Sequence, residues 1–259
     1  MSAVAPPAPA GVATSASRLA PWWPLAALTV AAAALRLSTL GLQSFWYDEA
    51  FTPVHVLHPS LWATLRSVVH SENTPPLWYL LAWVDSRILG TGEVALRLPS
   101  ALAGIATVPV AWAIGRELAG RCAALACAAL VAFNPLFVWY SQEARAYALF
   151  VLMAALAMLC FLRAQREPTP TDRRSASMAA FALAGALALL SHYFAVFLLT
   201  PMALWLLYTP RTRRAALPAV AAIAIVGAAL VPLIVAQGGH GTQWIGRWPL
   251  IERLEAIPQ

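Results

Sequence analysis

The chain has 259 residues, of which 61% are hydrophobic and 11% are charged. Its mean hydropathy of +0.69 and several apolar runs of membrane-spanning length exclude a soluble globular domain. The formal net charge is +6, but no basic stripe on a folded soluble module accompanies it, so nucleic acid is not expected as a partner. The sequence predicts an all-α polytopic membrane protein.

The N-terminal part predicts a tail followed by a first span. Residues 1–20 are rich in Pro, Ala, Ser and Thr, with Arg18 as the one charge, and this composition is typical of a disordered tail. Trp22–Leu42 is long enough to cross the roughly 30 Å hydrocarbon core as a helix. No small-residue cleavage site follows this run, so we expect it to stay attached rather than act as a secretory signal.

The region 43–97 predicts an outer loop with interfacial helices. Its one apolar stretch, Pro76–Val84, has about nine residues, too few to cross the membrane. A transmembrane domain is predicted over 21–236, and an outer-face segment over 237–259. Including the first span, about seven transmembrane helices are expected; the other six are Leu98–Ile114, Cys122–Tyr140, Tyr147–Leu162, Ala176–His192, Tyr193–Tyr208 and Ala215–Ala236.

The arginines predict the orientation. With a cytoplasmic N-terminus, ten of the 17 arginines lie in cytoplasmic segments and six in outer ones, with Arg36 inside the first span. This distribution follows the positive-inside rule, whereas treating Pro76–Gly90 as a span would reverse it. Most carboxylates and all five histidines then lie on or near the outer face, so chemistry is expected on that side.

Asp48 and Glu49 form a carboxylate pair just after the first span, among interfacial aromatic residues. One interpretation is that Asp48 caps a short interfacial helix. The other is functional, because carboxylates at a membrane boundary are costly unless they are used. Adjacent residues do not share a helix face, so the two should have separate tasks.

A second polar group lies in the short link between two spans and contains Gln142, Glu143, Arg145 and Tyr147. Glu143 and Arg145 could simply form a solvated ion pair, worth at most about 1 kcal/mol. The alternative, which we favour, is a tight outer turn that binds a phosphate, to which the planar guanidinium is suited.

Other polar residues are candidates with simpler alternatives. Glu72 and Asn73 precede a Pro-Pro pair that starts a helix, and the helix start does not explain Glu72. His192 and Tyr193 lie in a hairpin turn, where a histidine is more often a polar cap than a ligand. Arg36 needs a carboxylate, a carbonyl or a water-filled cleft, or else an anionic lipid headgroup.

The histidines allow a metal site but do not define one. His55 and His58 are three residues apart, and a zinc site with Glu72 or His70 is conceivable. No complete metal-ligand signature is present, so no metal ligands are named and a divalent metal stays an open cofactor.

Five motifs together resemble bacterial members of glycosyltransferase family 39, from about Leu25 to Leu207. They are WYDEA (46–50), TPPLWYLL (74–81), ALRLPSALAG (95–104), YSQEARAY (140–147) and SHYF (191–194). The family is related to the protein O-mannosyltransferases and, more distantly, to the lipid A aminoarabinose transferases and the oligosaccharyltransferase catalytic subunit.

The resemblance implies a GT-C fold, a sugar donor attached to a polyprenyl phosphate, and Asp48 as the catalytic carboxylate. Two features depart from the family pattern. Relatives often have a histidine beside the Pro-Pro pair, where this chain has Asn73 and Thr74, and they usually continue where this chain stops at Gln259.

The expected activity is inverting transfer of a mannose-like sugar to an acceptor hydroxyl of a protein, glycan or lipid, at the outer face of a bacterial plasma membrane. A phosphate is a stable leaving group, so one base suffices, and we assign Asp48 to that role and Glu49 to orienting a substrate. Arg145 is the first candidate to face the phosphate, followed by Arg36 and Arg97. The alternative is a non-catalytic family member that acts as a membrane scaffold; a transporter is less favoured because no internal repeat is found.

Overall fold

The computed structural model describes residues 22–166, 172–239, 249 and 252. The predicted tail at 1–20 and most of the predicted 237–259 segment lie outside these residues. Within them, every regular element is a helix: α1 (Trp23–Leu37), α2 (Phe51–Val56), α3 (Leu61–Ser71), α4 (Leu77–Leu89), α5 (Glu93–Phe133), α6 (Pro135–Ser141), α7 (Tyr147–Arg166), α8 (Asp172–Ser191), α9 (Ala195–Tyr208) and α10 (Arg213–Gln237).

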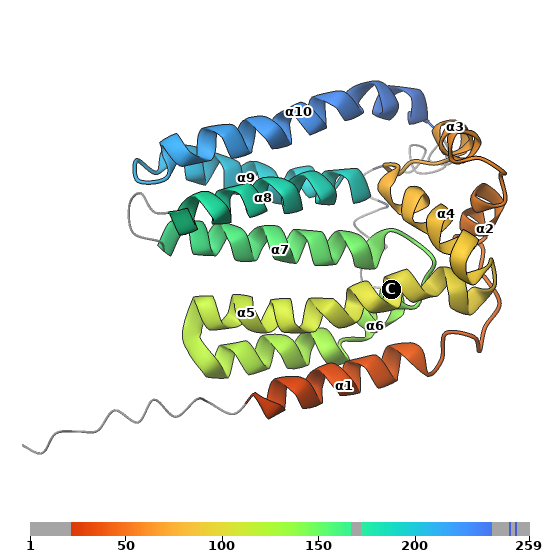
Figure 1. Ribbon diagram of the computed structural model, residues 1–259, viewed down its shortest axis with the longest axis horizontal. Helices are drawn as coiled ribbons and strands as arrows, with labels where there is room; N and C mark the ends of the chain where they lie inside the picture. The colour runs from red at the N-terminus through yellow and green to blue at the C-terminus, as the bar shows by residue number, and fades with distance from the viewer. Residues whose placement is uncertain (1–21, 167–171, 240–248, 250–251, 253–259) are drawn as a thin grey trace, which may run out of the picture.

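The long helices run side by side in a bundle, and the short helices α2, α3 and α4 gather at one end (Figure 1). Four helices in the described residues are long and apolar enough to cross a membrane: α5, α7, α8 and α10. The apolar helices α1 and α9 are shorter. The prediction of an all-α, multi-pass membrane protein is confirmed, whereas the number of seven spans stays a prediction.

α1 is shorter than the predicted Trp22–Leu42 span, because side chains from other segments bind the carbonyls near its end. The amide nitrogen of Gln142 donates to the carbonyls of Leu35 and Arg36, and Arg97 donates to the carbonyl of Leu40. Carbonyls in the last turn of a helix lack partners within the helix. The carbonyls of Leu35, Arg36 and Leu40 therefore keep hydrogen-bond partners although the helix ends at Leu37.

The predicted Cys122–Tyr140 span is interrupted at Pro135. Proline lacks an N–H group and disfavours a helical conformation at the preceding residue. Asn134 is accordingly extended, and its side chain accepts hydrogen bonds from Leu136 and Phe137 at the start of α6. The break directs α6 and the link that follows it toward the end of the bundle where α2, α3 and α4 lie.

α5 is a hairpin of two helical segments rather than one straight rod. Ala119 and Gly120 have non-helical backbone angles, and Gly120 has φ +81°, a left-handed conformation that glycine adopts without strain. Figure 1 shows the chain reversing there. Gly115 permits the close return, because a Cβ at this position would lie 2.6 Å from the Ala123 carbonyl oxygen.

The interfacial helices are held from two sides. α2, α3 and α4 share a buried cluster with α5 and the link before α7, formed by Val56, Val68, Trp78, Tyr79, Ala82, Leu96, Ala144 and Ala146. From the other side, the Gln237 amide at the end of α10 donates to the carbonyls of Val68 and Thr74 and accepts from the Tyr193 hydroxyl at 2.6 Å. These contacts fix the loops that carry the candidate site residues.

Gly115→Ala should destabilise the protein by about 1–3 kcal/mol, because the added methyl group meets backbone atoms that cannot move aside. Gly227→Ala is the matched control, since a Cβ there would make only an ordinary contact with Leu189 at 3.8 Å. Thermal unfolding of both variants in lipid nanodiscs checks this, and equal melting temperatures would contradict the close return at Gly115.

Candidate active site

The predicted polar residues converge at the end of the bundle that carries α2, α3 and α4. Asp48 and Glu49 come from the loop after α1, Glu72 from the end of α3, and Glu143 and Arg145 from the link between α6 and α7. The structure thus brings residues from three separate segments to the same end of the bundle.

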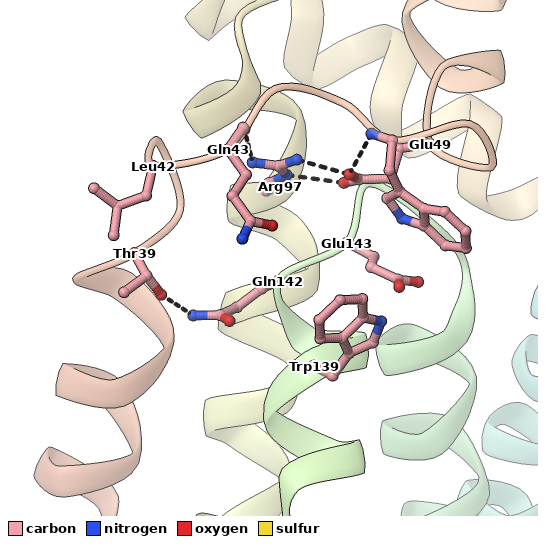
Figure 2. A pocket seen from close by; sticks show the side chains of 9 residues that line it. Thr39, Leu42, Gln43, Glu49, Arg97, Trp139, Gln142 and Glu143 are labelled. Carbon is pink, nitrogen blue, oxygen red and sulfur yellow. Dashed lines mark hydrogen bonds and ion pairs between the residues drawn. The ribbon is translucent and has the colours of Figure 1, made fainter.

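Arg97, in the first turns of α5, organises the loop after α1. Its guanidinium donates to both carboxylate oxygens of Glu49, at 2.8 and 2.7 Å, and to the carbonyls of Leu40, Gln43 and Ser44. Figure 2 shows Arg97 between Gln43 and Glu49. These five bonds use all five N–H groups of an arginine. No donor remains for a substrate, so the assignment of Arg97 to substrate binding is replaced by a structural role.

Glu49 is also committed to the fold. It is 1% exposed, and its oxygens accept the Ala144 N–H at 2.7 Å and the Trp46 N–H at 3.4 Å, in addition to the bonds from Arg97. Glu49 thereby ties the loop after α1 to the link before α7. This geometry favours a positioning role over the expected direct contact with a substrate.

Asp48 has a different environment from its neighbour, as its sequence position led us to expect. Its carboxylate lies 3.3 Å from Arg145 Nε and accepts a 3.3 Å hydrogen bond from the Tyr147 hydroxyl, and its side chain is 30% exposed. It does not cap α2, whose first residue follows Ala50 without any side-chain cap. Asp48 is therefore oriented by two partners and still accessible.

Arg145 joins Asp48 to a buried network. Its guanidinium donates to Glu72 at 3.2 Å and to the Tyr79 hydroxyl at 2.8 Å, and His55 Nε2 lies 3.5 Å from Glu72 on the other side. The alternative interpretation, a solvated pair of Arg145 with Glu143, is thus wrong: Arg145 is buried and its carboxylate partners are Glu72 and Asp48.

Arg145 and its acidic neighbours stabilise one another in their charged forms. Burial alone would lower the pKa of Arg145, but the neighbouring oxygens of Tyr79, Glu72 and Asp48 outweigh it and raise that pKa. Burial alone would raise the pKa of Glu72, but hydrogen bonding with His55 and the charge of Arg145 bring it below its usual value. Glu72 and Arg145 therefore stay ionised at neutral pH.

Glu143 differs from the other acids of the site in its partners and in its pKa. It is 3% exposed, and neither carboxylate oxygen has a hydrogen-bond partner among the described residues. Burial, together with the negative charges of Glu49 and Asp48, raises its pKa to about 7, although the nearby Trp139 indole and Arg145 act in the opposite direction. Figure 2 shows its carboxylate beside the indole of Trp139. Glu143 can therefore exchange a proton near neutral pH.

Glu143 and Glu49 line a cavity of about 400 Å³ on the outside of this network (Figure 2). Trp139 and Gln142 from α6 and its C-terminal end line it as well, as do Thr39, Leu42, Gln43 and Trp46 from the loop after α1. Its volume falls within the range of about 300–1,000 Å³ that is usual for small-molecule sites.

Three predicted binding residues have mainly structural contacts. The Arg36 guanidinium bonds the carbonyls of Ala32, Val131 and Ala132 and the Ser141 hydroxyl, so it satisfies helix-end carbonyls instead of pairing with an acid. The nitrogen of Gln142 caps α1, although its side chain lines the cavity. Tyr193 donates to Gln237, and burial raises its pKa to about 12.

His192 and Asn73 lie at the edge of the cluster. The His192 ring is 6.0 Å from that of Tyr147, and its Nδ1 accepts the Phe194 N–H, so the neutral ring carries its proton on Nε2. Burial and the charge of Arg145 lower the pKa of His192, which keeps the ring neutral and leaves Nε2 a donor. Asn73 is exposed next to Glu72.

Among the described residues, His55 and His58 do not gather with Glu72 or His70 into a cluster of three metal ligands. His55 bonds to Ser67, Ser71 and Glu72. In the described part of the chain, no three His, Cys, Asp or Glu side chains lie close enough together to hold a metal ion.

Sequence reasoning missed Tyr79 and the cavity tryptophans. Tyr79 is fully buried between Arg145 and His55, and the one available signal was its place on the buried face of α4 with Trp78 and Ala82. Trp46 and Trp139 were not named as site residues, because their shared cavity exists only when the loop after α1 meets α6.

The fold and the clustered acids define a membrane protein with a candidate active site at one end of its bundle, and comparison with known proteins assigns its family. The model of the family described as dolichyl-phosphate-mannose-protein mannosyltransferase matches residues 73–236, which is more than half of the chain. The protein belongs to this family, in agreement with the resemblance seen in its motifs.

A solved structure supports the same fold. A chain of the Saccharomyces cerevisiae protein O-mannosyltransferase Pmt1-Pmt2 complex, bound to the sugar donor, is similar with a TM-score of 0.62 and 21% sequence identity. The similarity covers 83% of this chain and 32% of the yeast chain, so this protein spans about a third of the length of that relative. No curated protein sequence matches the chain.

Glu49→Gln should lower stability by about 3 kcal/mol, because it leaves the buried Arg97 without its counter-charge. Glu117→Gln is the matched control: Glu117 pairs with the half-exposed Arg163 and Arg166, and such pairs contribute less than about 1 kcal/mol. Chemical unfolding of both variants, with limited proteolysis of the loop after α1, measures the difference. A Glu49→Gln protein as stable and as protease-resistant as the control would refute this role.

Glu143→Gln should change how stability depends on pH. The pKa of Glu143 rises on folding from about 4.5 to about 7. Its contribution to the free energy of unfolding is therefore fully present below pH 4.5 and is lost as the pH rises through 7. The glutamine variant should therefore match the wild type at pH 4.5 and be more stable at pH 8, by on the order of 2–3 kcal/mol. Melting temperatures of the two proteins across this pH range check the prediction. If both melting temperatures changed with pH in parallel, Glu143 would not be a buried carboxyl group without partners.

Proposed function

We propose that the protein transfers a mannose-like sugar, with inversion, from a polyprenyl-phosphate donor to an acceptor hydroxyl. Its membership in the mannosyltransferase family supports the reaction class. The observation that carries the proposal is Asp48, an accessible carboxylate that Arg145 and Tyr147 hold at the edge of the buried network.

Asp48 is the proposed base. In the reaction, the acceptor oxygen attacks the anomeric carbon, its proton passes to Asp48, and the bond to the phosphate oxygen breaks. The phosphate leaves as a stable anion with a second pKa near 6, so no acid needs to protonate it. A single base is sufficient, unlike glycoside hydrolysis, where a second carboxyl group must protonate a poor leaving group.

Arg145 is the proposed cation at the departing phosphate. It lies against Asp48, and its raised pKa keeps it charged throughout the reaction. The ring of His192, whose Nε2–H is a neutral donor, lies 6.0 Å from the ring of Tyr147. Donors fixed in advance stabilise charge that develops on a leaving group. Glu72 and Glu49 act indirectly, by holding Arg145 and the loop that carries Asp48.

The proposed setting is the outer face of a bacterial plasma membrane. The distribution of arginines supports a cytoplasmic N-terminal tail at 1–20, an outer loop at 43–97 and an outer-face segment at 237–259. α2, α3 and α4 would lie at the headgroup level, where the donor phosphate is found. Membrane lipids and the acceptor, which is a protein, glycan or lipid hydroxyl, are the other proposed partners.

Asp48→Asn tests the proposal. Purified protein in nanodiscs is assayed for transfer from polyprenyl-phosphate mannose to a panel of peptide, glycan and lipid acceptors. The variant should lose about 10²–10⁴-fold in turnover while still binding polyprenyl phosphate, because it lacks the base but keeps its shape. Asp172→Asn, at the other end of the bundle in the first turn of α8, should leave turnover unchanged. Undiminished turnover by Asp48→Asn would remove Asp48 from the mechanism.

A further inference from the structure

A groove of about 320 Å³ lies between α8 and α10, near the end of the bundle opposite α2, α3 and α4. Both helices begin at that end, as Figure 1 shows. Alanines line most of the groove: Ala179 and Ala182 on α8, and Ala215 and Ala219 on α10. It starts at Ser175 and follows about 10 Å of α8, at 1.5 Å per residue. The small side chains leave room for one narrow apolar chain along the two helices.

Arginines gather at the mouth of this groove. Arg174, at the start of α8, donates to the carbonyl of Arg211 at 2.9 Å, which joins α8 to the segment before α10. Four arginines in or next to these two first turns are exposed: Arg173, Arg211, Arg213 and Arg214. The first turns of the two helices contain one acid, Asp172. The mouth of the groove is therefore strongly positive.

These exposed arginines are not neutralised by the protein. Elsewhere at the same end of the bundle, Arg163 and Arg166 share Glu117 as their partner. Within the part of the chain that the structure describes, no ion pair is formed by Arg173, Arg211, Arg213 or Arg214. Like charges held close together repel one another, so an anionic group at the mouth would stabilise this arrangement. Guanidinium groups bind phosphate oxygens with particularly good geometry.

The same charges oppose the other occupant that such a groove would suit, a helix of a second copy of this chain. Alanines at four-residue spacing, such as Ala215 and Ala219, let membrane helices pack closely. In a symmetric pair, however, each copy would place its arginines against the same arginines of the partner. An anionic lipid has the opposite effect, because its phosphate offsets these charges.

We propose that the groove binds one anionic glycerophospholipid, such as phosphatidylglycerol. Its phosphate lies among Arg211, Arg213 and Arg214, and one acyl chain lies along Ala179 and Ala182. α8 and α10 are both apolar enough to cross a membrane, so a chain that follows them from the mouth enters the hydrocarbon layer. In the proposed orientation this lipid belongs to the cytoplasmic leaflet, on the side away from the candidate active site. The site does not depend on the proposed sugar transfer.

Two test variants each remove one part of the site. Arg213→Gln combined with Arg214→Gln removes two charges from the mouth. Ala179→Phe fills the groove with an aromatic ring. All three residues are exposed, so both variant proteins should fold, and their melting temperatures check this.

The chain offers a matched control for each test variant. Arg116→Gln combined with Arg121→Gln removes two exposed arginines of α5 at the same end of the bundle, away from the groove. Ala180→Phe adds the same ring to the same helix, at an exposed alanine that does not line the groove. The first control measures general attraction of an anionic membrane surface, and the second measures the effect of a bulky side chain on α8.

Native mass spectrometry of the full chain measures the binding. The protein is titrated with phosphatidylglycerol and, separately, with phosphatidylcholine that has the same acyl chains, and the spectra give the number of bound lipids and each Kd. Glycerol 3-phosphate, which has the phosphate without acyl chains, is added as a competitor. The same spectra report whether the protein is a monomer or a dimer.

The wild type should bind one phosphatidylglycerol at least about tenfold more tightly than phosphatidylcholine. Both test variants should lose about tenfold or more of that affinity, whereas both controls should stay within about twofold of the wild type. This pattern supports the proposal, because it requires the charged mouth and the open groove together.

The other outcomes overturn the lipid site. Equal affinities for the two lipids, or an equal loss in the Arg116→Gln and Arg121→Gln control, would mean general attraction to a charged surface. Undiminished affinity in Ala179→Phe would exclude the acyl chain from the groove, and displacement by glycerol 3-phosphate would reduce the site to one for free phosphate. A dimer that Ala179→Phe dissociates would assign the groove to a second copy of the chain.

Discussion

The ion pair between Arg97 and Glu49 is the interaction on which the rest of the site depends. A buried pair of this kind is stable only when its remaining hydrogen bonds are satisfied, and here every N–H of Arg97 has a partner. The pair turns the loop after α1 over the end of the bundle and, through the Ala144 N–H, attaches it to the link before α7. That attachment places Asp48 against Arg145.

The sequence predicted the general architecture well, because hydrophobic length is a local property. The apolar runs fell on helices, the hairpin at His192 was confirmed, and the five motifs indicated the correct family. Helix ends were predicted less well. α1 stops early because Gln142 and Arg97, distant in sequence, bind its last carbonyls and those just beyond it, and no local pattern records such contacts.

The candidate site could be located from the sequence, but the partners of its residues could not. Glu143 and Arg145 are two residues apart, and a pair between them was the simpler of two interpretations, yet Arg145 reaches Glu72, which is 73 positions away. Likewise, an arginine that binds a substrate and one that binds carbonyls look the same in sequence, so the carbonyl contacts of Arg36 and Arg97 were not foreseen. Only the packing of three separate segments distinguishes these two kinds of arginine.

The hydrogen bonds of Gln237 have a consequence for how the bilayer acts on this protein. Gln237 is the last residue of a long lipid-facing helix, and its amide is bonded to the carbonyls of Val68 and Thr74, on either side of Glu72. A change in hydrocarbon thickness that tilts α10 is resisted by this joint and is passed on to the segment that supports Arg145. Lipid composition can therefore act on the end of the bundle that carries the candidate active site.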